Sequence, residues 1–167
     1  MLVQPGEYIV RRQKTMASNP AEVQRILADF REWEAWGQLQ RVENSLITVD
    51  KESKAGPPTL TWSSEERFGS GKLTMAEVKP GESVRVKIDL EKPDLAQGEM
   101  LFHLEQNGYE VTVRWTITMQ NSLAGKAQFL VSDRGESVGL EMEACLKRIQ
   151  KIAEAWTKFR AKGQPVR

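Results

Sequence analysis

The clearest pattern in the sequence is an apolar stripe within residues 135–160. Apolar side chains recur there every three or four positions, which is the spacing of one face of an α-helix. The stripe consists of Val138, Met142, Cys145, Ile149, Ile152, Trp156 and Phe159. A stripe of this length buries its apolar face only against a large partner surface. The segment therefore predicts a long helix that packs on another layer of the protein.

Between residues 42 and 119 the pattern changes to short segments in which apolar and polar residues alternate, as in strands with one buried face. Six strands are expected, at residues 45–51, 59–67, 72–79, 83–90, 99–106 and 109–119. Glycine, proline and asparagine residues mark turns between them. The Asn107-Gly108 pair favours a two-residue type I′ hairpin between the last two strands. The long helix is thus expected to pack on an antiparallel sheet.

The beginning of the chain predicts a further strand and a first helix. Residues 7–16 alternate in polarity and are interpreted as a strand. Asn19 followed by Pro20, with Glu22 in the next turn, is typical of a helix start. This helix is expected to reach about residue 28.

A second, shorter helix is expected over residues 30–36, where Trp33 and Trp36 share one face and Gly37 can end it. The order of elements is then strand, two short helices, six strands and a long helix. This order predicts an α+β fold in which a curved antiparallel sheet wraps around the C-terminal helix. A strongly curved sheet closed by one helix can leave an interior hollow, and hollows of this kind bind small molecules.

Length and charge narrow the class of protein. With 167 residues, one domain over residues 1–167 is expected to bury roughly 70% of the surface that the unfolded chain exposes, with a polar tail fraying from about residue 161. There are 24 Lys and Arg residues against 23 Asp and Glu, so no basic excess favours binding to nucleic acid or anionic membranes. No apolar run approaches the roughly 20 residues that span a bilayer. These features predict a soluble chain, with a cytoplasmic location as the default.

The sequence contains one cysteine and one histidine, Cys145 and His103. A single cysteine forms no intramolecular disulfide, and its position on the apolar stripe favours a buried, inert thiol over a nucleophile. One cysteine and one histidine are too few for a structural zinc site, and no metal or cofactor is expected. His103 alternates with Phe102, so it is expected on the convex face of the sheet.

The residues expected to line the hollow are those whose strand parity or helix spacing places them on the inner face. They are Trp36, Trp62, Met75, Val86, Ile88, Phe102, Val113, Trp115, Met142 and Ile149. The competing interpretation is that most of them form an ordinary core. The inner face has few polar groups, and the candidates are Tyr8 and Glu66, the latter sharing the parity of Trp62. A buried carboxylate would have a raised pKa and could act as an acid, whereas a carboxylate at a wet rim would not.

Several segments resemble the START-like, helix-grip superfamily known as SRPBCC, and within it the polyketide cyclase/dehydrase-like group. The resemblance rests on the Asn-Pro-Ala-Glu-Val run at 19–23, on Trp33 and Trp36, on the Pro-Gly-Glu turn at 80–82, and on the Val-Thr-Val-Arg-Trp strand at 111–115. The closing helix departs from the group's pattern, with Met142 where phenylalanine is usual and Cys145 where glycine is usual. A larger side chain than glycine at position 145 could narrow the cavity.

The resemblance implies a deep, largely apolar cavity between sheet and C-terminal helix, used across the superfamily for lipids, sterols, polyketides, quinones and plant hormones. It implies no shared set of catalytic residues. Three hypotheses follow: binding of a small apolar or amphipathic ligand, a polyketide cyclase or dehydratase-like enzyme that transfers protons through Glu66 or Tyr8, and a module whose sheet edge or cavity mouth docks a partner protein. The sequence favours the first.

Overall fold

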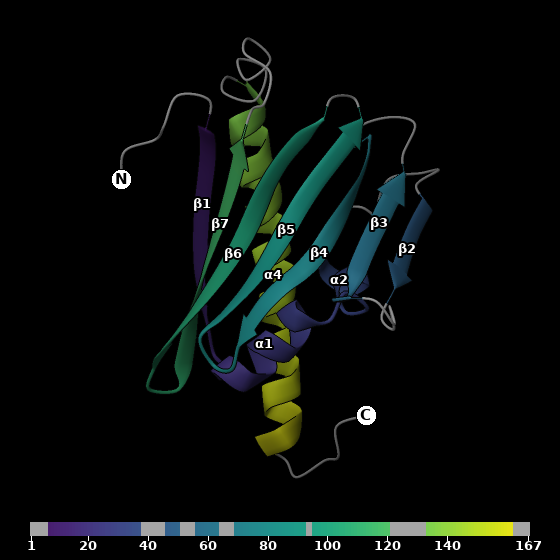
Figure 1. The fold of residues 1–167 in the computed structure, drawn as a ribbon. Helices are drawn as coiled ribbons and strands as arrows, with labels where there is room; N and C mark the ends of the chain where they lie inside the picture. Colours follow the sequence, from purple (N-terminus) through teal and green to yellow (C-terminus); the bar gives the residue numbers. More distant parts are fainter. Residues whose placement is uncertain are drawn as a thin grey trace.

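The computed structural model describes residues 7–37, 46–50, 56–63, 69–92, 95–120 and 133–161. The strands are β1 (Glu7–Met16), β2 (Leu46–Asp50), β3 (Thr59–Ser63), β4 (Ser70–Lys79), β5 (Ser83–Lys92), β6 (Ala96–Asn107) and β7 (Glu110–Gln120). The helices are α1 (Pro20–Ala28), α2 (Trp33–Trp36) and α4 (Asp133–Ala161). Figure 1 shows this arrangement. The order of elements is the one predicted.

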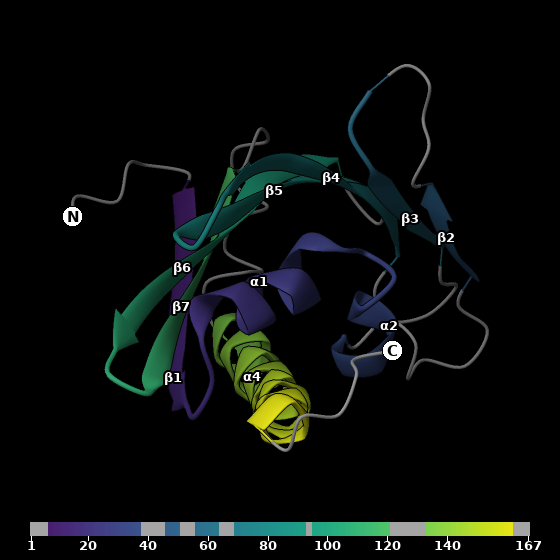
Figure 2. The same ribbon diagram turned by 90° about the horizontal axis from the view of Figure 1, so that it is seen from below.

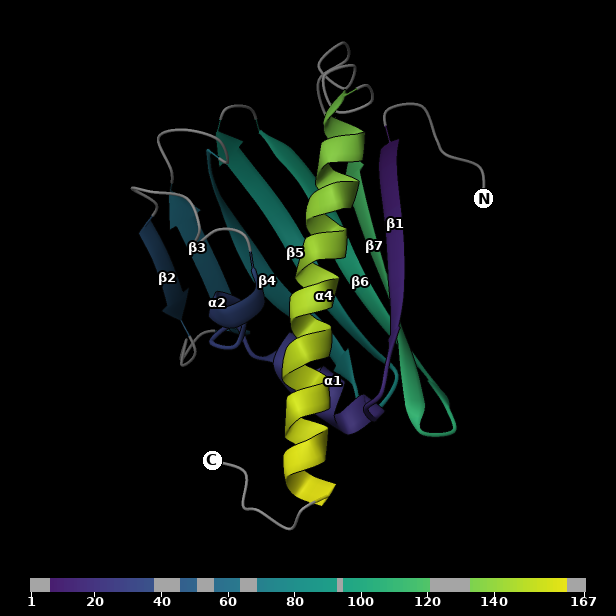
Figure 3. The ribbon, with the colours of Figure 1, turned by 180° about the vertical axis from the view of Figure 1, so that it is seen from behind.

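The seven strands form one antiparallel sheet in the order β1-β7-β6-β5-β4-β3-β2. The first strand of the chain therefore lies beside the last, and β1 and β2 are the two edges. The sheet is strongly curved, and α4 crosses its concave face together with α1 and α2 (Figures 2 and 3). The predicted α+β fold, a curved antiparallel sheet around a long C-terminal helix, is confirmed.

Strand parity correctly predicts the buried face. In β7 the residues Val111, Val113 and Trp115 are buried, and in β6 Phe102 and Leu104 are buried. His103 is exposed, as its parity requires. The concave face and α4 share one core, as expected for a sheet with one solvated side.

The β6–β7 hairpin differs from the prediction by one residue. Asn107 pairs with Glu110, so the two loop residues are Gly108 and Tyr109 rather than Asn107 and Gly108. Gly108 has φ 62°, a left-handed conformation that glycine adopts without a steric cost. Tyr109 was expected to begin the strand over residues 109–119, but it lies in the turn and is 96% exposed.

Element ends also shift by a few residues. The strand expected at 59–67 is observed as Thr59–Ser63, and Glu66 lies outside the described residues. Residues beyond 161, where the tail was expected to fray, are likewise outside them. Within the described part of the chain, no helix is long and apolar enough to cross a membrane.

Helix α1 begins as its sequence predicts and holds the sheet through one glutamine. The Asn19 side chain accepts a hydrogen bond from the Glu22 amide at 3.0 Å, with Pro20 in the first turn. Gln24 donates to the carbonyl of Lys79 at 2.6 Å and accepts from the amide of Gly81 at 2.9 Å. These contacts fix α1 to the β4–β5 turn at one end of the concave face.

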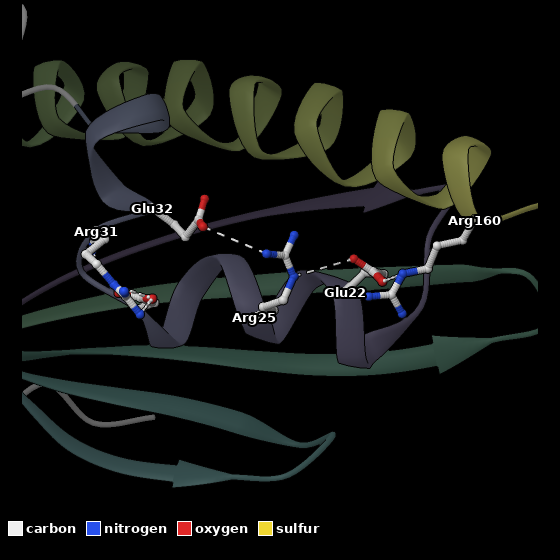
Figure 4. A network of polar contacts seen from close by, with 6 residues as sticks. Glu22, Arg25, Arg31, Glu32 and Arg160 are labelled. Carbon is white, nitrogen blue, oxygen red and sulfur yellow. Dashed lines mark hydrogen bonds and ion pairs between the residues drawn. The ribbon is translucent and has the colours of Figure 1, made fainter. Parts of the chain in front are cut away.

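A buried carboxylate joins α1 to the C-terminal end of α4 (Figure 4). Glu22 is 1% exposed, and its Oε1 lies 2.6 Å from the Nε of Arg160. Arg25 lies 3.8 Å from the other carboxylate oxygen and 3.8 Å from Glu32, with its guanidinium 4.3 Å above the Trp156 ring. Neither oxygen of Glu22 accepts a well-aligned hydrogen bond from the described residues. The free-energy cost of burying the carboxylate is therefore compensated mostly by its attraction to the charges of Arg25 and Arg160.

We expect Arg160→Met to lower the free energy of unfolding by about 1–3 kcal/mol, because it leaves the buried carboxylate of Glu22 with one distant cation. This is below the usual cost of breaking a buried pair because the Arg160 side chain is 50% exposed. Urea unfolding followed by tryptophan fluorescence measures the change. The control is Arg31→Met, which removes an exposed ion pair with Asp29 and should cost less than about 1 kcal/mol. Equal losses in both variants would contradict the role given to Glu22.

Candidate ligand-binding site

A cavity of about 510 Å³ lies between the concave face of the sheet and the helices α2 and α4. Its lining is mostly apolar. Strands β1 to β7 contribute Tyr8, Ile47, Val49, Leu60, Trp62, Leu73, Ile88, Leu90, Met100, Trp115, Ile117 and Met119. The α1–α2 region contributes Phe30, Arg31, Trp33, Glu34, Trp36 and Gly37, and α4 contributes Val138, Glu141, Met142 and Cys145.

The position of α4 explains why the cavity exists. The Arg12 side chain of β1 lies against Gly139 and pairs with Glu143 at 3.1 Å, so the first half of α4 packs along the β1 edge. Figures 2 and 3 show the opposite edge, β2, well away from α4. Among the helices that the structure describes, the four-residue α2 is the one that approaches that half of the concave face. The inner side chains there are not covered by a long helix, and the cavity forms beneath them.

Aromatic rings dominate the cavity walls. Four of the five tryptophans in the chain line it, together with Phe30 and Tyr8. The rings of Trp36 and Trp115 meet edge to face, with centroids 6.0 Å apart. Trp115 stacks on Phe102 at 4.9 Å. Rings that interlock in this way give the cavity broad, rigid faces.

Three of the aromatic residues that line the cavity carry a buried polar atom without a hydrogen-bond partner among the described residues. These atoms are the hydroxyl of Tyr8 and the Nε1 of Trp36 and of Trp115. The Nε1 of Trp33, by contrast, donates to the carbonyl of Leu27 at 2.8 Å. A buried donor without an acceptor costs about 1–3 kcal/mol, so each such group needs a physical explanation. An acceptor on a bound molecule would provide one.

Two of the described groups that line the cavity have a raised pKa: Arg31, through its hydrogen bond with Asp29, and Tyr8. Burial raises the pKa of Tyr8 above 10.0, and the nearby charge of Arg12 opposes that rise in part. A phenol with a raised pKa keeps its proton near neutral pH. Tyr8 is therefore suited to donate a hydrogen bond and is poorly suited to act as a base.

The polar part of the lining marks where the cavity reaches the surface. Arg31 and Glu34 of the α2 region are exposed, and Glu141 of α4 is half-buried and lines the same cavity. Arg31 is already paired with Asp29, with nitrogen–oxygen distances of 2.6 and 2.9 Å. The charge of Arg31 is thus compensated within the protein, and the entrance between α2 and α4 carries no uncompensated cation from this residue.

Gly71 makes room for one wall of the cavity. Trp62 of β3 is the register partner of Gly71 in β4, and its ring crosses the position that a side chain would occupy. A Cβ at residue 71 would lie 2.5 Å from Cη2 of Trp62 and 2.7 Å from the carbonyl oxygen of Asp89. Only glycine leaves room for the indole at this point of β4.

The structure brings together half of the residues predicted from sequence to contact a ligand. Those that line the cavity are Trp36, Trp62, Ile88, Trp115 and Met142. Those buried in the core outside it are Met75, Val86, Phe102, Val113 and Ile149. The alternation of residues along a strand identifies which side chains face the helices. It does not identify which end of that inner face the helices leave uncovered. Contact with a ligand remains a prediction for all ten.

Several lining residues were not predicted as ligand contacts. Leu60, Leu73 and Leu90 share the parity of residues that were predicted, so a complete use of the alternation would have included them. Cys145 was expected to be buried, which is confirmed at 4% exposure, but its place on the cavity wall follows from the tilt of α4. Of the two catalytic candidates, Tyr8 lines the cavity and Glu66 lies outside the described residues.

We expect Gly71→Ala to lower the free energy of unfolding by about 1–3 kcal/mol, the usual cost of overpacking, because the new methyl group displaces Trp62. In an unobstructed strand the same change stabilises by about 0.5–1 kcal/mol, so the sign is diagnostic. Urea unfolding measures it. Gly56→Ala is the control, because no atom lies within 4 Å of its Cβ position. A stabilised Gly71→Ala variant would show that the indole does not occupy this space.

Tyr8 should ionise above pH 10.0, and folding stability should fall as the pH rises past that value. The folded state holds the phenolic proton more tightly than the unfolded chain, so deprotonation favours unfolding at high pH. Tyr8 and Tyr109 are the two tyrosines of the chain, and the Tyr109→Phe variant isolates the signal of Tyr8. Ultraviolet absorbance of the phenolate reports the titration. A midpoint below pH 10.0 would show that burial does not control this group.

No family model and no curated protein sequence matches the chain. Solved structures do match. A protein of Chromobacterium violaceum is 14% identical with a TM-score of 0.63, covering 87% of this chain and 96% of its own. The di-domain ARO/CYC StfQ of the steffimycin biosynthetic pathway is 10% identical with a TM-score of 0.63, covering 93% of this chain and 52% of its own. Ara h 8.0201 is 9% identical with a TM-score of 0.62, covering 90% of this chain and 99% of its own.

At these identities the similarity concerns the fold. The shared architecture is an antiparallel sheet curved around a C-terminal helix. The chain has a helix-grip fold, and its sequence motifs resemble those of the START-like SRPBCC superfamily.

Proposed function

We propose that the protein binds a small, largely apolar molecule with a flat ring system and one or more oxygen acceptors in the cavity between sheet and α4. The observation that carries this proposal is the combination of aromatic walls with three buried donors, on Tyr8, Trp36 and Trp115, that have no partner among the residues the structure describes. The apolar walls supply the binding energy, and the donors select the ligand.

The volume of the cavity fits this class of ligand. Sites for drug-sized molecules span about 300–1,000 Å³, and the cavity measures about 510 Å³. A ring system of two to four fused or linked rings suits such a space. The entrance beside Arg31 and Glu34 is polar, so an oxygen-bearing end of the ligand could remain there in contact with water.

Aromatic walls favour a flat ligand over an alkyl chain. Indole faces stack on planar rings and gain about 0.5–1.5 kcal/mol per pair beyond the area that they bury. The ring of Trp62 occupies the space beside Gly71, and Trp115 is held by Phe102 and Trp36, so both rings are positioned before a ligand binds. Positioning in advance lowers the entropic cost of binding. The fold shared with an ARO/CYC protein is consistent with ligands of this kind.

Binding is favoured over catalysis by the chemistry of the lining. Cyclisation or dehydration requires a group that takes up and releases a proton near neutral pH. Burial raises the pKa of Tyr8, so its phenol holds the proton rather than exchanging it. His103, the one histidine of the chain, is exposed and follows the outward parity of β6. A cyclase or dehydratase-like activity through Tyr8 or Glu66 is the second hypothesis.

Native mass spectrometry of freshly purified protein, followed by release of any bound molecule, tests the function directly. In parallel, calorimetry compares 1,8-dihydroxyanthraquinone, a flat ligand with oxygen acceptors, with dodecanoate, an alkyl chain. We expect the anthraquinone to bind at least about tenfold more tightly, because both ligands carry oxygen acceptors but only the flat ring system stacks, which contributes about 0.5–1.5 kcal/mol for each indole face. Tighter binding of dodecanoate would contradict a flat ligand and would indicate that the cavity binds lipids with alkyl chains.

Tryptophan variants identify the donors that the ligand uses. Trp36→Phe and Trp115→Phe keep a ring but remove the N–H, and the variant that loses the donor used should bind the anthraquinone about fivefold to tenfold more weakly. Trp156→Phe is the matched control, because Trp156 does not line the cavity and lies beneath Arg25. Equal affinity in all three variants would show that the ligand uses neither the indole N–H of Trp36 nor that of Trp115.

A further inference from the structure

Cys145 lies where α4 faces the cavity. It follows Val138, Glu141 and Met142 at helical spacing, and these four residues form the wall that α4 contributes. The residue is 4% exposed, so its sulfur is closed off from bulk solvent while its side chain borders a space of ligand size. It is the single cysteine of the chain. Any reaction of a thiol in this protein therefore occurs at the cavity wall.

A guanidinium group lies against the sulfur. Nη2 of Arg148, three residues further along α4, is 3.3 Å from Sγ of Cys145. Nε of the same side chain donates to the carbonyl of Trp36 at 2.9 Å, which fixes the guanidinium between α4 and α2. A positioned cation that donates to sulfur stabilises the thiolate, and the thiolate is the form that attacks electrophiles.

The unpartnered indoles indicate a ligand acceptor independently of the sulfur. Trp36 is 1% exposed and Trp115 is 5% exposed, and both line the cavity that Cys145 lines. Each has a buried N–H that finds no hydrogen-bond acceptor within the described part of the chain. Arg148 donates to the backbone carbonyl of Trp36 and to the sulfur of Cys145, so the residue that carries one of these indoles is joined to Cys145 through one side chain. A carbonyl oxygen is the acceptor that such an N–H most commonly meets in proteins.

We propose that the cavity captures flat, apolar α,β-unsaturated carbonyl compounds by covalent addition to Cys145. The proposal rests on the proposed function and specifies a reactive class of ligand for the same cavity. The ligand provides an electrophilic carbon for the sulfur and a carbonyl oxygen for an indole N–H. Arg148 is a positioning residue that favours the thiolate.

The chemistry is a conjugate addition without net oxidation or reduction. A bond forms between Sγ and the β-carbon of the ligand, and the electron pair of the carbon–carbon double bond moves towards the carbonyl oxygen. The resulting enolate accepts a hydrogen bond from an indole N–H. The enolate then takes up one proton at its α-carbon, and this proton balances the one that the thiol released. The product has the summed mass of protein and ligand.

The cavity provides the selectivity of the reaction. Because the sulfur is closed off from bulk solvent, polar thiol reagents reach it slowly. An apolar ligand is first held beside the sulfur, and holding two reacting groups together raises the rate over that of a chance encounter. The protein should therefore react faster than free cysteine with a flat enone, and slower than free cysteine with iodoacetamide.

The test uses trans-chalcone, a flat enone, and dihydrochalcone, which lacks the reactive double bond. Intact-mass spectrometry of the folded protein should show one chalcone added to wild type and none to Cys145→Ser. Calorimetry should show that dihydrochalcone binds reversibly to both proteins.

Arg148→Met should slow the addition of chalcone by at least about tenfold, and Arg148→Lys should restore part of the rate. Lys147→Met, which removes an exposed cation from the same turn of α4, should leave the rate unchanged.

The outcomes separate the two proposals. Reversible binding of dihydrochalcone without a chalcone adduct would overturn covalent capture, leave the binding function intact and show that the thiol is inert. An adduct that forms only in urea would overturn it in the same way. Failure of both compounds to bind and to react would overturn the binding of flat ligands itself. If Arg148→Met left the rate of adduct formation unchanged, Arg148 would have no role in the reaction.

Discussion

One long helix must cover the concave face of a seven-stranded sheet, and this mismatch in size determines the rest of the structure. Helix α4 packs along β1, where Arg12 lies against Gly139 and pairs with Glu143. That contact fixes the helix near one edge and leaves the inner side chains of β2 to β4 without a long covering helix. Helix α1 fills the end of the face near the β4–β5 turn through Gln24. The cavity is the part of the concave face that remains.

Arginine side chains at three points along the same helix connect the cavity to the rest of the molecule. Arg12 contacts its first half, Arg148 joins its middle to the carbonyl of Trp36, and Arg160 joins its C-terminal end to the buried Glu22. Each contact is polar and connects α4 to a different element. A change in the position of α4 would therefore disturb charged groups that have few alternative partners, which favours a single position for the wall that includes Cys145.

Most of the fold was predictable from sequence because strand alternation and helix periodicity are strong along this chain. The errors arise where a local signal allows two registers. At Asn107-Gly108 both residues suit a tight turn, and the turn lies one residue later than predicted. The site was less predictable. Phe102 and Trp115 share an inner face, yet Trp115 lines the cavity and Phe102 lies behind it. Which end of the face stays uncovered depends on the tilt of α4, and no single segment encodes that tilt.

The pairing of β1 with β7 has a consequence for synthesis of the chain. Glu7 pairs with Gln120, so the sheet is completed only after nearly all of its residues have left the ribosome. The apolar inner face then stays exposed to water until the residues of α4, which follow every strand, are also available. Contacts between such distant residues form slowly, and exposed apolar faces associate with other chains. This protein is therefore expected to depend on chaperones during translation more than a helical bundle of equal length would.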